Sequence, residues 1–256
     1  MESYTKIRIS LLILILIFLI LKLKDLLTPK EERFLKAAEN GNLKKIKSML
    51  NKEVNIKTLI NAVDKENNTA LILASKFGYS EIVKILIENG ADIDARNNEN
   101  STALIEASSF YYEVVKILIE NGADINAKDN EGTTPLMNAS TEDDNYEICK
   151  TLIENGANVN DKDLQGDNAL KYASTFLEWD LAIIKLLIES GIEINTQNKD
   201  GYTALMEATI SGNEEIVKVL IENGADINIK NNDGKTALDY AEENDYKSII
   251  ELLKNK

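Results

Sequence analysis

Apolar residues recur at helical spacing along most of the chain, in short segments separated by polar turns. One segment carries an i, i+1, i+4, i+5 stripe made of Ile82, Val83, Leu86 and Ile87. Such a stripe gives a helix a single apolar face. A shorter stripe begins upstream at Leu71, and Gly90 follows at a position where a helix can end in the left-handed conformation. The pattern therefore predicts pairs of short amphipathic helices joined by polar turns.

These helical pairs repeat with a nearly constant period. The segment NNTALILASKFGYSEIVKILIENGADIDARN from Asn67 matches NSTALIEASSFYYEVVKILIENGADINAKD from Asn100. The equivalent helix-start positions are Thr69, Thr102, Thr134, Asn168, Thr203 and Thr236, spaced by 33, 32, 34, 35 and 33 residues. A divergent first copy lies at 34–50, and the last copy is truncated. Since one copy cannot bury its own apolar stripe, the copies are expected to stack on one another.

Three positions in each copy have a clear physical role. The hydroxyl or amide at the helix start can cap free backbone N–H groups. A small residue inside the first helix lets neighbouring helices approach closely, and it is Ala74, Ala107, Ala139, Ala173, Ala208 or Ala241. The glycine after the second helix suits a left-handed C′ position and is Gly90, Gly122, Gly156, Gly191 or Gly224.

Period and motif together resemble the ankyrin repeat over residues 33–256. The resemblance implies an all-α solenoid of stacked helix-turn-helix hairpins with projecting β-turns. It also implies protein binding through the turn tips and the exposed side of the first helices. The family's TPLH tetrapeptide keeps its proline only at Pro135 and its histidine nowhere, which predicts looser contacts between turns within an unchanged fold.

The copies differ most between their two helices. The second copy lacks one residue near Tyr111, whereas the third and fourth carry insertions around 142–144 and 175–180. About four extra residues also separate Leu50 from Ile60.

The first 27 residues form a separate predicted segment. Residues 11–21 are an uninterrupted run of Leu, Ile and Phe, which predicts a single hydrophobic helix before the repeats. Lys6 and Arg8 precede the run as they would in a secretory signal, but no small-x-small cleavage site follows it. We therefore expect an uncleaved membrane anchor at 1–27 and a linker at 28–32, with a cleaved signal as the alternative. Basic residues on the two sides are nearly balanced, so orientation stays open.

The amino-acid composition excludes several kinds of binding and catalytic site. The net charge is −14 and residues 1–30 contribute +3, so the remaining residues carry −17 and would repel nucleic acid. The sequence has no histidine and one cysteine, Cys149, at a position where other copies have a buried valine. Glycine-rich phosphate loops and EF-hand spacing are also missing from the sequence. We expect no catalytic, cofactor-binding or metal-binding residues.

Candidate partner-binding residues are those that vary on the surface implied by the resemblance. Phe77, Phe110 and Phe176 occupy one equivalent position near the end of the first helix, and Lys76 and Ile210 lie one position earlier in their copies. The turn tips add Glu99, Glu131, Leu164 and Tyr202. The rings would form an apolar patch with an acidic rim. Alternatively they pack against the inter-helix loops, and Trp179 and Tyr111 fit either arrangement.

These expectations describe a membrane-tethered, non-enzymatic and monomeric scaffold that binds a protein. A secreted or periplasmic inhibitor or accessory factor of an enzyme is the first alternative. An enzyme with an unrecognised site is the second, and it would require a deep pocket lined by converging carboxylates rather than the shallow groove expected here.

Overall fold

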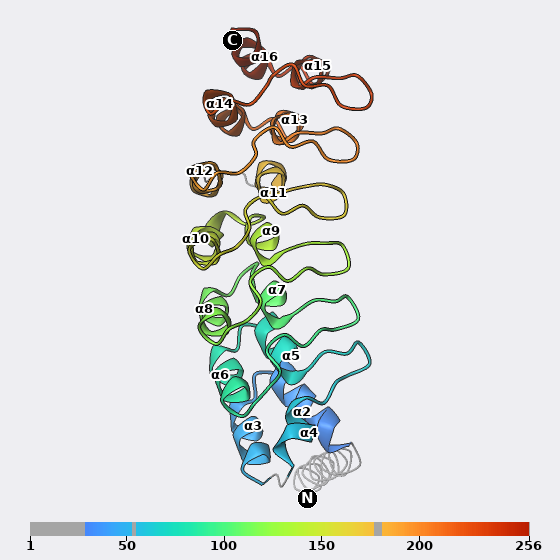
Figure 1. Ribbon diagram of the computed structural model, residues 1–256, viewed down its shortest axis with the longest axis vertical. Coiled ribbons are helices and arrows are strands. Elements are labelled where there is room, and N and C mark those ends of the chain that lie inside the picture. Colours follow the sequence, from blue (N-terminus) through green and yellow to red (C-terminus); the bar gives the residue numbers. More distant parts are fainter. Residues whose placement is uncertain (1–28, 53–54, 177–180, 256) are drawn as a thin grey trace, which may run out of the picture.

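In the residues that the structure describes, seven helical hairpins stack in chain order into an elongated solenoid (Figure 1). The computed structural model describes residues 29–52, 55–176 and 181–255, without the side chain of Phe176. The first helices of the hairpins are α2 (Lys30–Glu39), α5 (Ala70–Lys76), α7 (Ala103–Ala107), α9 (Pro135–Ala139), α11 (Ala169–Phe176), α13 (Ala204–Ile210) and α15 (Ala237–Glu243). The second helices are α3 (Leu43–Leu50), α6 (Ser80–Glu88), α8 (Tyr112–Glu120), α10 (Tyr146–Glu154), α12 (Ala182–Glu189), α14 (Glu214–Glu222) and α16 (Lys247–Lys254). The predicted helical solenoid is confirmed.

The hairpins form three parallel rows (Figure 1). First helices make the middle row, second helices make an outer row, and the loops between copies project on the opposite side. Two short elements interrupt the regularity. The extra residues after Leu50 include helix α4 (Ile56–Ile60), and the insertion in the third copy includes the 3-10 helix η1 (Asp143–Asn145).

The six first helices after α2 start where the polar side chains predicted them. The Thr69 Oγ1 accepts a hydrogen bond from the Ile72 N–H at 3.2 Å, and Asn168 Oδ1 accepts from the Lys171 N–H at 3.1 Å. The other four helix-start threonines cap in the same way. At the far end of the hairpin, Gly90 and its equivalents have φ between +83° and +99°, as expected for a left-handed C′ residue.

One continuous apolar core runs the length of the stack. The six equivalent alanines are fully buried, which lets first helices of consecutive copies lie against one another. The position of the family's histidine is filled in four copies by buried Ile or Met side chains, namely Ile72, Ile105, Met137 and Met206. In the fourth copy Lys171 occupies it and pairs with Glu207 of the next copy at 3.1 Å. Apolar packing and one ion pair thus stand where imidazole hydrogen bonds would link the copies.

The projecting turns are joined by backbone hydrogen bonds. The Asn98 N–H donates to the Glu66 carbonyl at 2.9 Å, and the Leu164 N–H donates to the Glu131 carbonyl at 2.8 Å. Within a turn, Asp129 Oδ1 accepts from two N–H groups of its own loop, at 2.9 and 2.8 Å. The turns therefore form a connected wall along the middle helices.

The start of the first hairpin differs from the expectation. A linker was expected at 28–32, but Lys30–Glu32 form the first turn of α2 and Pro29 is its N-cap residue. Proline suits this place because the first N–H groups of a helix have no intrahelical partner. The predicted hydrophobic helix and anchor at 1–27 lie outside the described residues, as does Trp179. Among the helices that the structure describes, none has the length and apolarity needed to span a membrane.

Candidate protein-binding surface

A groove opens between the middle helices and the wall of turns at the first three regular copies. Its volume is about 440 Å³. It is lined by Lys76, Phe77, Glu99, Ser101, Ile105, Glu106, Ser109, Phe110, Tyr111, Asp129 and Asn138. We call this hollow the turn–helix groove. It contains four of the nine predicted partner-binding residues, two of them phenylalanines.

Both phenylalanine rings stay largely in solvent. Phe77 is the C-cap residue of α5 and is 41% exposed, and Phe110 follows α7 and is 63% exposed. Each ring has one aromatic neighbour: the centroids of Phe77 and Tyr79 are 6.3 Å apart, and those of Phe110 and Tyr111 are 6.2 Å apart. The rings therefore contact the inter-helix loops without being buried in the core.

Charged groups flank these rings. The Lys76 Nζ lies 3.4 Å from Glu106 Oε2, which links the end of α5 to the face of α7. Glu99 and Asp129 approach from the wall of turns on the other side of the groove. One cation therefore stands among three carboxylates, and the groove is acidic overall.

A second hollow shares the Phe110 ring with the turn–helix groove. It measures about 450 Å³ and is lined by Phe110, Tyr112, Glu142, Asp143, Asp144, Asn145, Glu147 and Ile148. We call it the acidic pocket. Tyr112 is 41% exposed, so the two aromatic rings of this pocket face solvent beside four carboxylates.

The acidic pocket is built from the irregularities of two adjacent copies. Between regular copies, a tyrosine before the second helix packs over the glycine of the preceding loop, as Tyr111 does over Gly78. The second copy lacks that glycine, and the insertion in the third copy supplies Asn145 instead of a tyrosine. The buried Asn145 Nδ2 donates to the carbonyls of Ser109 at 2.7 Å and Ala139 at 3.1 Å. This contact leaves the acidic loop standing beside Phe110.

The remaining predicted residues lie elsewhere in the stack. Leu164, at a turn tip, is 57% exposed, and Glu131 is exposed at the preceding tip. Ile210 is half-buried at the end of α13. Tyr202 is also half-buried, and its hydroxyl lies 2.7 Å from the Tyr240 hydroxyl of the next copy. Phe176 ends α11, and its side chain lies outside the described residues.

Several groove residues were not among the predictions. Glu106 and Asn138 occupy the same face of the first helix in successive copies, and the Asn138 Nδ2 donates to the Ile105 carbonyl at 3.3 Å. The sequence could have indicated that these two side chains share a face, because each follows the buried leucine of its copy by two residues. Tyr112 was missed because the pocket around it depends on a deletion in one copy and an insertion in the next.

Groups with other reactive chemistry do not converge on either hollow. Cys149 is fully buried, and burial raises the pKa of its thiol to about 12. A third hollow of about 570 Å³ lies between α2 and the first projecting turn, near Pro29, and none of its described lining residues is aromatic. Among the described residues, no group of three or more Cys, Asp or Glu side chains is placed to hold a metal ion.

Solved structures with the same architecture include the crystal structure of the human ASB11 ankyrin repeat domain. The two chains are 25% identical, with a TM-score of 0.75, over 87% of this chain and 96% of that one. Among curated proteins, the Notch-regulated ankyrin repeat-containing protein of Xenopus tropicalis is 36% identical over 78 residues, which are 30% of this chain and 68% of that protein. The E3 ubiquitin-protein ligase XBAT32 of Arabidopsis thaliana is 34% identical over 76 residues, which are only 15% of its length.

The family model of ankyrin repeats in three copies matches residues 34–129, 93–163, 127–198 and 170–256. These matches overlap and together cover residues 34–256. Ankyrin repeats are generally non-enzymatic modules for protein–protein interaction. The chain belongs to the ankyrin-repeat family.

Proposed function

We propose that this protein is a non-enzymatic scaffold that binds a protein partner in the turn–helix groove, with Phe77 and Phe110 as the central contacts. The observation that carries the proposal is the pair of phenylalanines, 41% and 63% exposed, that line one groove. Exposed apolar side chains gathered in a hollow with a polar rim are typical of interaction sites.

The energetics favour the rings over the charges as the source of affinity. Complete burial of an exposed phenylalanine contributes about 1.5–3 kcal/mol, and aromatic anchors in pockets commonly dominate an interface. Exposed ion pairs contribute about 0–1 kcal/mol. Lys76 and Glu106 already neutralise each other, so we expect them to orient a partner more than to hold it.

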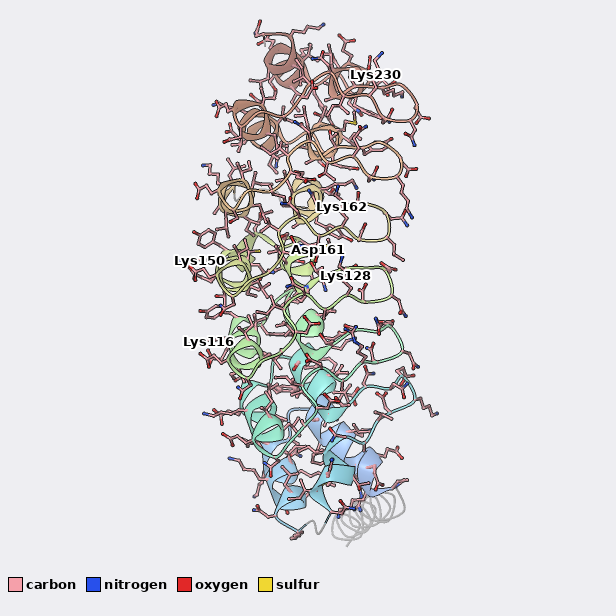
Figure 2. All side chains as sticks on the ribbon, viewed as in Figure 1. Lys116, Lys128, Lys150, Asp161, Lys162 and Lys230 are labelled. Carbon is pink, nitrogen blue, oxygen red and sulfur yellow. The ribbon has the colours of Figure 1, made fainter. Side chains whose placement is uncertain are left out.

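Site-specific photo-crosslinking in the source cells tests this surface. Phe77 or Phe110 would be replaced by benzoylphenylalanine, which keeps an aromatic ring in place. The control position is Lys116, which is exposed on α8 in the outer row, on the side away from the turns (Figure 2). We expect one partner to crosslink from positions 77 and 110 and not from 116. Equal labelling from all three positions, or none from the groove, would remove the basis of the proposal.

A paired substitution separates binding from packing. Phe77→Ala with Phe110→Ala should weaken partner capture while leaving the melting temperature nearly unchanged, because both rings are partly in solvent. If the double variant instead melts much earlier and still binds when folded, these rings serve the stack and the groove is not the binding site.

We further propose that residues 1–27 tether the scaffold to a membrane. The support is the uninterrupted apolar run at 11–21, flanked by Arg8 and Lys22, which can reach the interfaces and lengthen a short span. Carbonate extraction of native membranes combined with N-terminal sequencing tests it. We expect the chain to stay in the membrane with its N-terminal residues retained. A soluble product that begins after Leu27 would favour a cleaved signal and a secreted or periplasmic protein.

A further inference from the structure

We infer that the partner presents a basic segment, with apolar and cationic side chains next to each other, that crosses the Phe110 ring from the turn–helix groove into the acidic pocket. This inference rests on the proposed function and names the chemistry of what is bound. It depends on three features of the described residues: shared lining, exposed rings and unbalanced charge.

The first feature is continuity. Phe110 lines both hollows, so a chain that contacts this ring can reach the turn–helix groove and the acidic pocket. The two volumes are similar, about 440 and 450 Å³, and each exceeds that of a single side chain. A peptide bound over Phe110 could therefore place side chains in both hollows.

The second feature is the distribution of exposed rings. The large apolar side chains that are exposed in the described residues are Val63, Phe77, Phe110, Tyr112 and Leu164. The three aromatic members of this set all line one of the two joined hollows. Tyr112 stands where the preceding copy has the small polar Ser80, so the stack itself does not require an aromatic ring there.

The third feature is charge. The acidic pocket has four carboxylates and no basic side chain in its lining. Glu142, Asp144 and Glu147 are all exposed, which makes them available to an incoming cation. An arginine placed there could pair with a carboxylate and lie over Phe110 or Tyr112, since guanidinium groups favour aromatic faces. The same carboxylates would repel a phosphate backbone or an anionic lipid surface, so a basic protein segment fits best.

The test uses a displayed library of random twelve-residue peptides selected on the full-length chain in non-ionic detergent. Enriched peptides would be synthesised with a fluorescent label, and their affinities measured by fluorescence anisotropy. We expect the enriched peptides to be net positive and to pair Arg or Lys with apolar residues. Each exposed carboxylate lost should weaken binding about two- to five-fold, so Glu142→Gln, Asp144→Asn and Glu147→Gln together should weaken it about tenfold or more.

A matched variant controls for the general charge of the protein. Glu214, Glu215 and Glu222 are exposed on α14, two copies beyond the acidic pocket. At about 10 Å per helix layer they lie roughly 20 Å away, beyond the Debye length of about 10 Å at 0.1 M salt. Their replacement by Gln changes the net charge equally, and we expect the affinity to change less than twofold. Tyr112→Ser, which copies the preceding repeat, should weaken Arg-containing peptides at least threefold.

Three outcomes would overturn the inference: enrichment of neutral or acidic peptides, no enrichment at all, or equal losses in the pocket and control variants. Circular dichroism of each variant checks that the stack is intact. The failure of this inference differs from that of the proposed function. A native partner that crosslinks at positions 77 and 110 but binds the pocket variant normally would leave the scaffold function standing and refute the basic segment.

Discussion

The contact between Gly78 and Tyr111 predicts how strongly neighbouring copies constrain each other. Gly78 has φ +73°, and a Cβ added there would lie 2.4 Å from Tyr111 Cδ1 and 2.9 Å from Tyr111 Cγ. Because Cγ is at the base of the ring, a rotation of the ring cannot relieve the overlap. Gly90 has a similar φ of +85° but no atom within 4 Å of the added Cβ. Alanine substitutions at the two glycines therefore separate the cost of backbone strain from the cost of steric overlap with Tyr111.

The magnitudes follow from these geometries. An alanine in the left-handed region costs about 1–2 kcal/mol, and this cost applies to both positions. Extra volume in a packed site adds about 1–3 kcal/mol, and this cost applies only to Gly78. We therefore expect Gly90→Ala to lower the free energy of unfolding by about 1–2 kcal/mol and Gly78→Ala by about 2–5 kcal/mol.

Urea unfolding of the full-length chain, followed by circular dichroism at 222 nm, measures both changes. The decisive control is Tyr111→Ala, since removing the ring should reduce the cost of Gly78→Ala to that of Gly90→Ala. A double-mutant cycle would then show a coupling of about 1–3 kcal/mol between the two positions. If Gly78→Ala and Gly90→Ala destabilise equally, or if the cycle shows no coupling, the tyrosine does not brace one copy against the next.

Further predictions concern three other residues of the stack, namely Cys149, Asn145 and Tyr202. Because burial raises the pKa of Cys149 to about 12, iodoacetamide at pH 8.5 should alkylate the folded chain at least about a hundredfold more slowly than the chain in 8 M urea. Above pH 9 the thiol ionises in the unfolded chain before it does so in the folded chain, so the free energy of unfolding should fall by up to about 1.4 kcal/mol per pH unit. Cys149→Val should remove this contribution to the pH dependence of the free energy of unfolding. Asn145→Ala removes the amide that donates to the Ser109 and Ala139 carbonyls and should cost about 2–4 kcal/mol in urea unfolding, whereas an unchanged free energy of unfolding would show that these hydrogen bonds do not hold the loop. Tyr202→Phe should cost about 1 kcal/mol by losing the Tyr240 contact, and unchanged stability would argue against that hydrogen bond.

Much of the fold could be predicted because the same local physics recurs in every copy. The helix-start threonines cap as expected, the alanines are fully buried, and the glycines after the second helices adopt positive φ. Cys149 occupies the core position that alignment with its valine equivalents indicated. Each of these residues acts within its own copy or against an identical neighbour, so period and residue type suffice to place it.

The candidate site was harder to predict because it depends on mismatched neighbours. Phe77 and Phe110 were found from their equivalent positions, and the structure brings them to one groove. Tyr202 was predicted to bind a partner because it lies at a turn tip on the implied surface. Its hydroxyl instead contacts that of Tyr240, thirty-eight residues later in the chain. The acidic pocket could not be predicted at all, since it appears only when the shortened second copy stacks on the lengthened third copy.

Binding specificity and stability depend on different kinds of position in this stack. Residues at periodic positions are constrained because they stabilise the stack. The caps, the alanines, the wall of turns and the tyrosine over the glycine each hold one copy to the next. Changing such a residue changes stability before it changes recognition. A residue that departs from the period, such as Tyr112 or Glu142, is free of that constraint and can be selected by what it binds. Tyr112 and Glu142 line the acidic pocket between the second and third regular copies, and substitution of these exposed side chains should therefore change binding more than stability.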